Sequence, residues 1–286
     1  MSDRPRISLL VATYNWPRAL ELVLDSVRGQ RVLPFEVVIA DDGSREETRA
    51  LIDRVRATLP VPLLHVWHED TGFRLAAIRN KAIAAARGDY VVQIDGDIVL
   101  HEAFIAAHAR FARRGRWVQG SRALVERPTT ERLLAGERVR LWPFTPALKI
   151  RQNALYAPWL TPLVHGPTDG LKRIRGAHMA FWRDDLLRVN GYDESIEGWG
   201  REDSELATRL IHSGVVRRNL KFSAVCYHLW HKQASFDAVD RNHEVFMRTV
   251  RERRTRCERG NKKKHRRSSA VSTPKGTGVS LLFPHK

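Results

Sequence analysis

The sequence predicts an α/β fold in which a mainly parallel central sheet carries helices on both faces. Strand-like apolar runs alternate with helix-like amphipathic runs up to residue 115, and such alternation is typical of parallel strands joined by crossover helices. The chain has 286 residues, of which 43% are hydrophobic, and this suffices for one large domain. Polar residues follow each of the first four strand-like runs, as expected at the ligand-binding edge of a parallel sheet.

The elements of the first half are marked by their apolar periodicity. In the first helix, Leu20, Val23 and Val27 share one face, and Asn15 is the expected N-cap. The predicted strands are 7–13, 35–44, 62–69 and 89–97, and the predicted helices are 16–30, 45–59, 73–88 and 101–115.

The second half is less regular. Residues 122–175 contain six prolines and are expected to form loops and short helices that cover a site. Residues 176–194 are predicted to form a strand, a short helix and a turn. A helix over 201–214 that ends at Gly214 follows, and 220–231 form the last predicted strand.

The net charge of +17 is concentrated near the C-terminus. Residues 251–286 contain 12 lysines and arginines against 2 glutamates, a net +10, which leaves +7 for the rest of the chain. This polar stretch is predicted to be a basic disordered tail. It either keeps the protein in solution or contacts an anionic membrane surface. Nucleic acid is the weakest candidate partner, because no recognisable nucleic-acid-binding motif accompanies the charge.

The apolar runs and the cysteines indicate the cellular compartment. No apolar run reaches the roughly 18 residues of a membrane-spanning helix, and the N-terminal residues show no signal-peptide pattern. We therefore expect a cytoplasmic protein. Cys226 and Cys257 are far apart, so neither a disulfide framework nor a CxxC metal site is predicted.

An acidic turn follows the fourth predicted strand. Asp95 and Asp97 flank a single glycine there, and two carboxylates so spaced suit a hard divalent cation such as Mn²⁺ or Mg²⁺. Acidic turns after strands are common, so the tripeptide alone is weak evidence for a site. The chain has neither a GxGxxG nor a GxxxxGK[ST] motif, which argues against a dinucleotide-binding or P-loop enzyme. Phosphates bound at this edge would need a metal instead.

Several stretches together resemble a known family. VATYNWPRALELVLDSVRGQ, VVIADDGS and GFRLAAIRNKAIAAARGDYVVQIDGDIVL resemble the nucleotide-sugar half of family 2 glycosyltransferases with the GT-A fold. RGAHMAFWRDDLLRVNGYDESIEGWGREDSELATRL resembles the acceptor half of bacterial polysaccharide and lipopolysaccharide glycosyltransferases, and is similar to that of chondroitin-polymerase-type and β-1,4-galactosyltransferase-type enzymes. The resemblance covers roughly residues 5–232 and is thin over 122–170. It implies a nucleotide-sugar half at 1–120 and an acceptor and catalytic half at 121–250, followed by the tail at 251–286.

The resemblance implies a role for each matching residue of the nucleotide-sugar half. Asp42 matches the acidic residue that meets the uracil ring, and Asp95 matches the carboxylate near the ribose and the metal. Asp97 matches a metal ligand, which His228 completes, and His231 lies close enough in sequence to be confused with His228. The remaining matches to nucleotide- and sugar-binding positions are Thr13, Tyr14, Asn15, Arg79 and Asn80.

The stretch GWGREDSEL combines a glycine-flanked tryptophan with a cluster of acids. Acids in the first turn of a helix are ordinary, because the helix dipole favours negative charge there. However, Leu206 and Leu210 follow Asp203 at helical spacing, so Asp203 is expected on the buried side, where a carboxylate needs a partner or a function. The resemblance implies that Asp203 is the general base and that Glu202 binds acceptor hydroxyls. Acceptor contacts are also expected from the turn residues Gly198, Trp199 and Gly200.

The sequence thus predicts an inverting, metal-dependent glycosyltransferase. The expected donor is a UDP-sugar. The expected acceptor is a saccharide or lipid-linked saccharide of a bacterial envelope glycan such as lipopolysaccharide, made at the inner face of the inner membrane. Two alternatives stay open at this point. One is another nucleotide-dependent α/β transferase, such as a nucleotidyltransferase or methyltransferase, and the other is a non-catalytic protein that binds glycan or nucleic acid.

Overall fold

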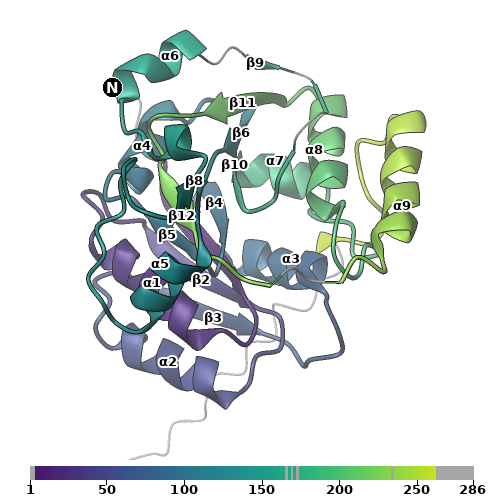
Figure 1. The fold of residues 1–286 in the computed structure, drawn as a ribbon. Helices are drawn as coiled ribbons and strands as arrows, with labels where there is room; N and C mark the ends of the chain where they lie inside the picture. The colour runs from purple at the N-terminus through teal and green to yellow at the C-terminus, as the bar shows by residue number, and fades with distance from the viewer. Residues whose placement is uncertain (1–3, 165–166, 169, 172–173, 233–234, 262–286) are drawn as a thin grey trace, which may run out of the picture.

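The structure, a computed structural model, describes residues 4–164, 167–168, 170–171, 174–232 and 235–261. Its centre is an eight-stranded sheet with the strand order β3-β2-β1-β4-β10-β6-β11-β9 (Figure 1). The first four strands in this order run parallel, as predicted, because helices cross over between them. The strands are β1 (Ile7–Thr13), β2 (Glu36–Asp41), β3 (Leu63–Trp67), β4 (Tyr90–Asp95), β6 (Arg116–Gly120), β9 (Pro167–Thr168), β10 (His178–Trp182) and β11 (Val216–Leu220).

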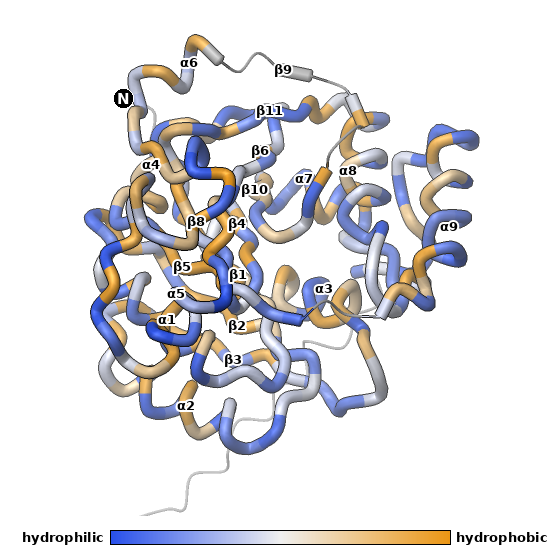
Figure 2. The backbone as a smooth tube through the Cα atoms, viewed as in Figure 1, coloured by the Kyte–Doolittle hydropathy of each residue, from blue (hydrophilic) through white to orange (hydrophobic). Residues whose placement is uncertain are grey.

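Helices cover both faces of the sheet, as predicted for apolar strands that are buried on two sides. One apolar core lies between the sheet and α1, α2 and α4, and the other lies between the sheet and α3, α7 and α8. Figure 2 shows the sheet strands as the apolar centre between these layers. The helices are α1 (Pro17–Arg28), α2 (Glu46–Arg56), α3 (Leu75–Ala85), α4 (Phe104–Phe111), α5 (Arg127–Leu134), α6 (Thr161–Val164), α7 (Arg183–Arg188), α8 (Glu202–His212) and α9 (Val239–Arg251), with the 3₁₀ turns η1 (Arg151–Ala154) and η2 (Pro158–Leu160).

A second, four-stranded sheet lies beside the first and carries part of the candidate site. Its order is β5-β12-β7-β8, with β5 (Ile98–Leu100), β12 (Cys226–His228), β7 (Ala123–Val125) and β8 (Leu148–Lys149). β5 begins directly after the acidic turn and pairs antiparallel with β12, so His228 lies opposite Ile98. The small sheet therefore brings the C-terminal part of the chain to the end of β4.

The structure corrects several predicted boundaries. The N-cap of α1 is Trp16 rather than Asn15, whose side chain instead accepts a hydrogen bond from the backbone N–H of Arg45 at 2.9 Å. Of the strand predicted over 220–231 only β12 forms, and β11, which ends at Leu220, was not predicted. They belong to different sheets, and an apolar run alone does not reveal to which sheet a strand belongs.

The C-terminal region is ordered further than predicted. Helix α9 packs on α8, and the chain after it stays folded as far as Asn261, which is buried together with Cys257. The backbone N–H of Asn261 donates to the Asn190 carbonyl at 3.0 Å. The predicted disordered tail at 251–286 therefore starts too early, and its remainder, 262–286, lies outside the described residues. In the described part of the chain, every helix is too short or too polar to span a bilayer.

Candidate active site

The loops after the parallel strands are joined by hydrogen bonds into one polar edge. The backbone N–H of Asn15 donates to the Ser44 hydroxyl at 2.8 Å, which ties the loop after β1 to the loop after β2. The Tyr14 hydroxyl donates to Asp70 at 2.8 Å and so links the loop after β3. Thr13, at the end of β1, is buried and accepts the backbone N–H of Asp42 at 3.0 Å. The predicted nucleotide-binding positions of these loops thus lie together at one edge of the sheet.

Asp42 is fixed at the floor of this edge. Its Oδ1 lies 2.6 Å from His68 Nε2, and its Oδ2 accepts the backbone N–H of Arg74 at 2.9 Å. These contacts hold the carboxylate in one orientation. The implied role of Asp42 toward a uracil ring stays a prediction.

The acidic turn is shaped by Gly96. Its backbone N–H donates to the Ala12 carbonyl at 2.6 Å, and a Cβ at this position would lie only 2.8 Å from the same oxygen. Only glycine allows so close an approach to the end of β1. The turn directs Asp95 toward the polar edge and Asp97 toward the small sheet.

Asp97 lies against two histidines: His228, the last residue of β12, and His231, three residues later. Its Oδ2 is 3.6 Å from His228 Nε2 and 3.3 Å from His231 Nε2, and one ligand atom from each of the three residues lies within 4.8 Å of the others. The other oxygen of Asp97 is buried without a hydrogen-bond partner among the described residues. His231 was only noted as close in sequence to His228, but here both imidazoles face the same carboxylate.

The electrostatics of this cluster fit a divalent cation. Burial, and then the neighbouring Asp95, raise the pKa of Asp97 to about 8, and burial lowers the pKa of His228 to about 4. A neutral imidazole is the form that binds a metal, and a cation favours the charged carboxylate. One carboxylate and two imidazoles make a mixed oxygen and nitrogen donor set of the kind that holds a divalent transition-metal ion. Asp95, the third predicted metal ligand, accepts a hydrogen bond from Arg79, and its role toward a metal stays a prediction.

Arg79 connects the two halves of the site. This guanidinium is buried within α3, and it donates to Asp95 at 2.9 Å and to Glu202 at 3.2 Å. It therefore joins the end of β4 to the beginning of α8. The resemblance implied that Arg79 faces the donor. Its contact with the acceptor half cannot be predicted from the sequence.

Asn80 does not reach the open edge, which corrects its predicted role toward the nucleotide and sugar. It is fully buried, accepts the backbone N–H of Tyr192 at 2.8 Å, and donates to Glu194 at 2.9 Å. The residue one position after Arg79 points about 100° away around a helix. Asn80 therefore fixes the loop after α7 instead of lining the site.

The turn before α8 uses positive φ angles to bring its acids to the site. Gly198 and Gly200 have φ of 76° and 100°, and Arg201, which precedes the helix, has φ of 76°. A Cβ at Gly198 would lie 2.5 Å from the Ala238 side chain, so α9 packs too closely for any larger residue. The exposed Trp199 meets Phe236 edge to face, with ring centroids 4.8 Å apart. Phe236 had no predicted role.

Glu202 and Asp203 lie next to each other in partly buried positions at the start of α8. Burial, and then the charge of Asp203, raise the pKa of Glu202 to about 7. Burial also raises the pKa of Asp203, although hydrogen bonds from the Ser204 hydroxyl and backbone N–H, the latter at 2.6 Å, oppose this. The predicted inward register of Asp203 is confirmed. A carboxylate with a raised pKa at a substrate-binding edge is suited to accept a proton.

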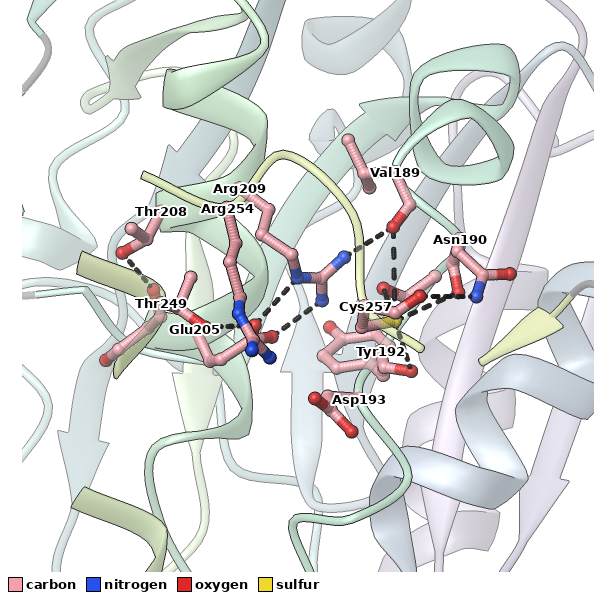
Figure 3. A network of polar contacts seen from close by, with 12 residues as sticks. Val189, Asn190, Tyr192, Asp193, Glu205, Thr208, Arg209, Thr249, Arg254 and Cys257 are labelled. Carbon is pink, nitrogen blue, oxygen red and sulfur yellow. Dashed lines mark hydrogen bonds and ion pairs between the residues drawn. The ribbon is translucent and has the colours of Figure 1, made fainter. Parts of the chain in front are cut away.

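A buried polar network holds α8 in place (Figure 3). Arg209 pairs with Glu205 through two hydrogen bonds, both partners are buried, and Arg209 also donates to the Val189 carbonyl at 2.6 Å. Thr249 of α9 donates to Glu205 at 3.0 Å. The Cys257 thiol lies 3.5 Å from the carbonyl oxygen of Asn190, the residue after Val189. The ordered C-terminal segment therefore helps to fix the helix that presents the acids.

Solved structures place this fold among the GT-A glycosyltransferases. Staphylococcus aureus TarS matches with a TM-score of 0.59 and 18% identity, over 86% of this chain and 39% of that chain. The mannosyltransferase PcManGT from Pyrobaculum calidifontis, in complex with GDP-Man and Mn²⁺, matches with a TM-score of 0.55 and 23% identity, over 87% and 65%. At these identities the likeness shows the fold.

Family models then define the family. The model of glycosyl transferase family 2 matches residues 8–173, and that of the N-terminal domain of galactosyltransferase matches residues 165–232. The chain belongs to glycosyl transferase family 2. It is 25% identical to chondroitin synthase from Escherichia coli over 80% of this chain and 36% of that protein, and 29% identical to validoxylamine A glucosyltransferase from Streptomyces hygroscopicus subsp. limoneus over 75% and 49%. The chain thus spans between about a third and a half of these relatives.

Proposed function

We propose that the protein is an inverting glycosyltransferase that moves a sugar from a UDP-sugar to a saccharide acceptor with the help of Mn²⁺ or Mg²⁺. One observation carries the proposal: Arg79 donates to Asp95 and to Glu202, the neighbours of Asp97 and of Asp203, so the candidate metal ligands and a carboxylate with a raised pKa lie on one edge. The same edge gathers the loops after the parallel strands. Family membership supports sugar transfer over nucleotidyl or methyl transfer, and over a non-catalytic binding role.

The donor proposal rests on the donor half of the site. A structural neighbour, TarS, has been solved in complex with UDP-GlcNAc, and Asp42 at the strand-end edge is the residue that would recognise the uracil. The residues that would hold the cation are Asp97, His228 and His231, with Asp95 beside them. When bound, the cation would neutralise the charge that develops on the leaving diphosphate.

The chemical step follows from the acceptor half. Asp203 takes the proton of an acceptor hydroxyl, and the hydroxyl oxygen forms a bond to the anomeric carbon of the donor. The bond between that carbon and the diphosphate oxygen breaks, and the electron pair leaves with UDP. A single displacement inverts the anomeric configuration. Glu202 orients acceptor hydroxyls, and Trp199 offers an exposed aromatic face on which a sugar ring can stack.

The acceptor class is proposed as an envelope glycan of bacteria, such as lipopolysaccharide, with synthesis on the cytoplasmic side of the inner membrane. Chondroitin synthase, a relative, is named for making a polysaccharide, which supports a glycan acceptor. The basic residues 262–286 would add an attraction to an anionic membrane.

A donor panel tests this proposal. UDP-sugars are incubated with the protein and Mn²⁺, Mg²⁺ or EDTA, and UDP release and the anomeric configuration of the product are measured by NMR. We expect UDP release from one or a few UDP-sugars that stops in EDTA, and a product of inverted configuration. Equal turnover in EDTA would refute the metal requirement, and a product of retained configuration would refute the single displacement.

A further inference from the structure

Exposed apolar side chains are concentrated in one segment outside the site. Of the 15 large hydrophobic side chains that are exposed in the described part of the chain, seven lie between residues 142 and 163. This segment is a small fraction of the protein, and the catalytic proposal uses none of these side chains. Exposed apolar residues gathered in this way mark an interaction surface.

Two of these residues form a ridge on η2 and α6. Trp159 and Leu163 are 71% and 77% exposed, the highest values among the large hydrophobic residues described. They are four positions apart in one continuous helical stretch, so they project from the same face. We call this pair the Trp159–Leu163 ridge.

The ridge is held rigidly against the body of the protein. Between its two members, Thr161 is buried and donates from its hydroxyl to the Lys221 carbonyl at 2.7 Å. Just before the ridge, the backbone N–H of Ala157 donates to the Phe222 carbonyl at 2.8 Å. The apolar side chains are therefore displayed by a fixed turn, and the fold does not bury them.

The ridge lies at the catalytic edge of the sheet. It rests on residues 221–223, which follow the carboxyl end of β11. β10 runs antiparallel to both β4 and β6, and β11 runs parallel to β6, so β11 ends at the same edge as Asp95. Three strand spacings separate β4 from β11, about 14 Å. Figure 1 shows α6 beyond β11 at the periphery of the molecule.

The segment that carries the ridge is basic. Residues 138–164 contain four lysines and arginines and no acidic residue. Lys221, whose backbone carbonyl accepts the Thr161 hydroxyl, is a further basic residue next to the ridge. The ridge supplies apolar side chains of the kind that enter the headgroup region of a bilayer, and these basic residues supply charge that complements anionic lipid.

We propose that the Trp159–Leu163 ridge inserts into the headgroup region of an anionic phospholipid bilayer and turns the catalytic edge toward the membrane. The acceptor would then be a saccharide carried on a membrane lipid. The lipid-linked acceptor rests on the proposed function, whereas membrane binding by the ridge does not depend on it. A second copy of the chain is the other occupant that an apolar ridge can have, and the experiment separates the two.

The test uses the full chain and vesicles of phosphatidylcholine with or without 30% phosphatidylglycerol. Binding is measured by co-sedimentation at low salt and at about 0.5 M salt. High salt screens the attraction of the basic residues 262–286 to anionic lipid, but it does not remove the insertion of apolar side chains. We expect Trp159→Ser/Leu163→Ser to weaken binding to the anionic vesicles at least about tenfold at both salts. The matched control is Leu33→Ser/Phe35→Ser, which removes an exposed leucine and aromatic residue from the loop before β2, at the opposite edge.

Three readouts decide the outcome. Quenching of tryptophan fluorescence by brominated lipid is expected in the wild type and is reduced in the ridge variant. Transfer to a soluble acceptor is expected to stay within twofold of the wild type, which shows that the variant is folded and separates this proposal from the catalytic one. Equal vesicle binding by the ridge and control variants would overturn the proposal. A second contrary result would be that the wild type and the control variant are dimers while the ridge variant is a monomer.

Discussion

Replacement of Arg79 by methionine removes the one side chain that bridges the two halves of the site. The variant keeps the length and apolar stem of the side chain but leaves Asp95 and Glu202 without their shared cation. Removing one partner of a buried ion pair costs about 3–5 kcal/mol, because the remaining charge stays buried. The Asp95 side chain is 33% exposed, so water replaces part of its interaction. We therefore expect a loss of about 2–4 kcal/mol and a fall in melting temperature of about 5–10 °C.

The loss should depend on pH. Without Arg79 the pKa of Glu202 rises above its value of about 7, so the folded variant takes up a proton near neutrality. A raised carboxyl pKa means that stability falls as the pH increases from the unfolded value toward the folded one. Thermal unfolding of Arg79→Met should therefore show a smaller deficit at pH 6 than at pH 8.

Two further variants make this test specific. Arg6→Met removes an arginine that also pairs with an aspartate, Asp89, at 3.0 Å. Both side chains of this pair are exposed, so we expect a loss of stability below about 1 kcal/mol. Arg79→Met/Glu202→Gln removes the orphaned charge and should regain part of the lost stability. If Arg79→Met and Arg6→Met melt at the same temperature, the bridge does not hold the site together.

The remaining predictions concern the metal cluster, the acceptor acids and the acidic turn. His228→Ala and His231→Ala should each weaken Mn²⁺-dependent UDP binding at least about tenfold in calorimetry, with a melting temperature equal to that of the wild type. If wild type and variants bind UDP equally in Mn²⁺ and in EDTA, the two histidines are not metal ligands. Glu202→Gln should have a higher free energy of unfolding than wild type at pH 8, by roughly 1–3 kcal/mol, because the wild-type carboxyl, whose pKa rises from 4.5 to about 7 on folding, loses stability as the pH rises through that window. The gain should vanish near pH 4, and a pH-independent difference would contradict this. Gly96→Ala should cost about 1–3 kcal/mol in chemical denaturation and weaken metal binding, because its Cβ would lie 2.8 Å from the Ala12 carbonyl oxygen; an unchanged midpoint would show that the turn relaxes freely.

The parallel half of the sheet follows from local patterns. Each apolar run is buried on both faces, and each strand end carries polar side chains, so periodicity and strand order placed Thr13, Asp42 and Asp95 at one edge. The direction of β10 was not predictable, because an apolar run has the same pattern whether it pairs parallel or antiparallel. β11 has the sequence VRRNL, which contains no apolar run, so periodicity did not predict it.

The contacts across the site depend on residues far apart in the chain. Arg79 meets Glu202 over 123 positions, and a sequence shows no sign of such a pair. The role of Asn80 was misplaced because its neighbour Arg79 carries the contact to the site. His231 could have been found from its spacing to His228, since His228 ends the strand that pairs beside the acidic turn and His231 follows three residues later. Helix α9 carries Val239, Phe246 and Val250 at helical spacing, a pattern that predicts a helix there.

Asp203→Asn tests the central claim most directly, because it keeps the shape of the side chain but removes its ability to accept a proton. The measurement compares the dissociation constant of the UDP-sugar with the rate of transfer, for wild type and variant at saturating metal. We predict that donor binding changes less than about twofold, because the proposed donor site is at the strand ends. Transfer should fall by roughly 10²–10⁴, the usual contribution of a general base. A variant that transfers sugar within a few-fold of the wild-type rate would show that Asp203 is only an acid at a helix N-terminus, without a role in the reaction.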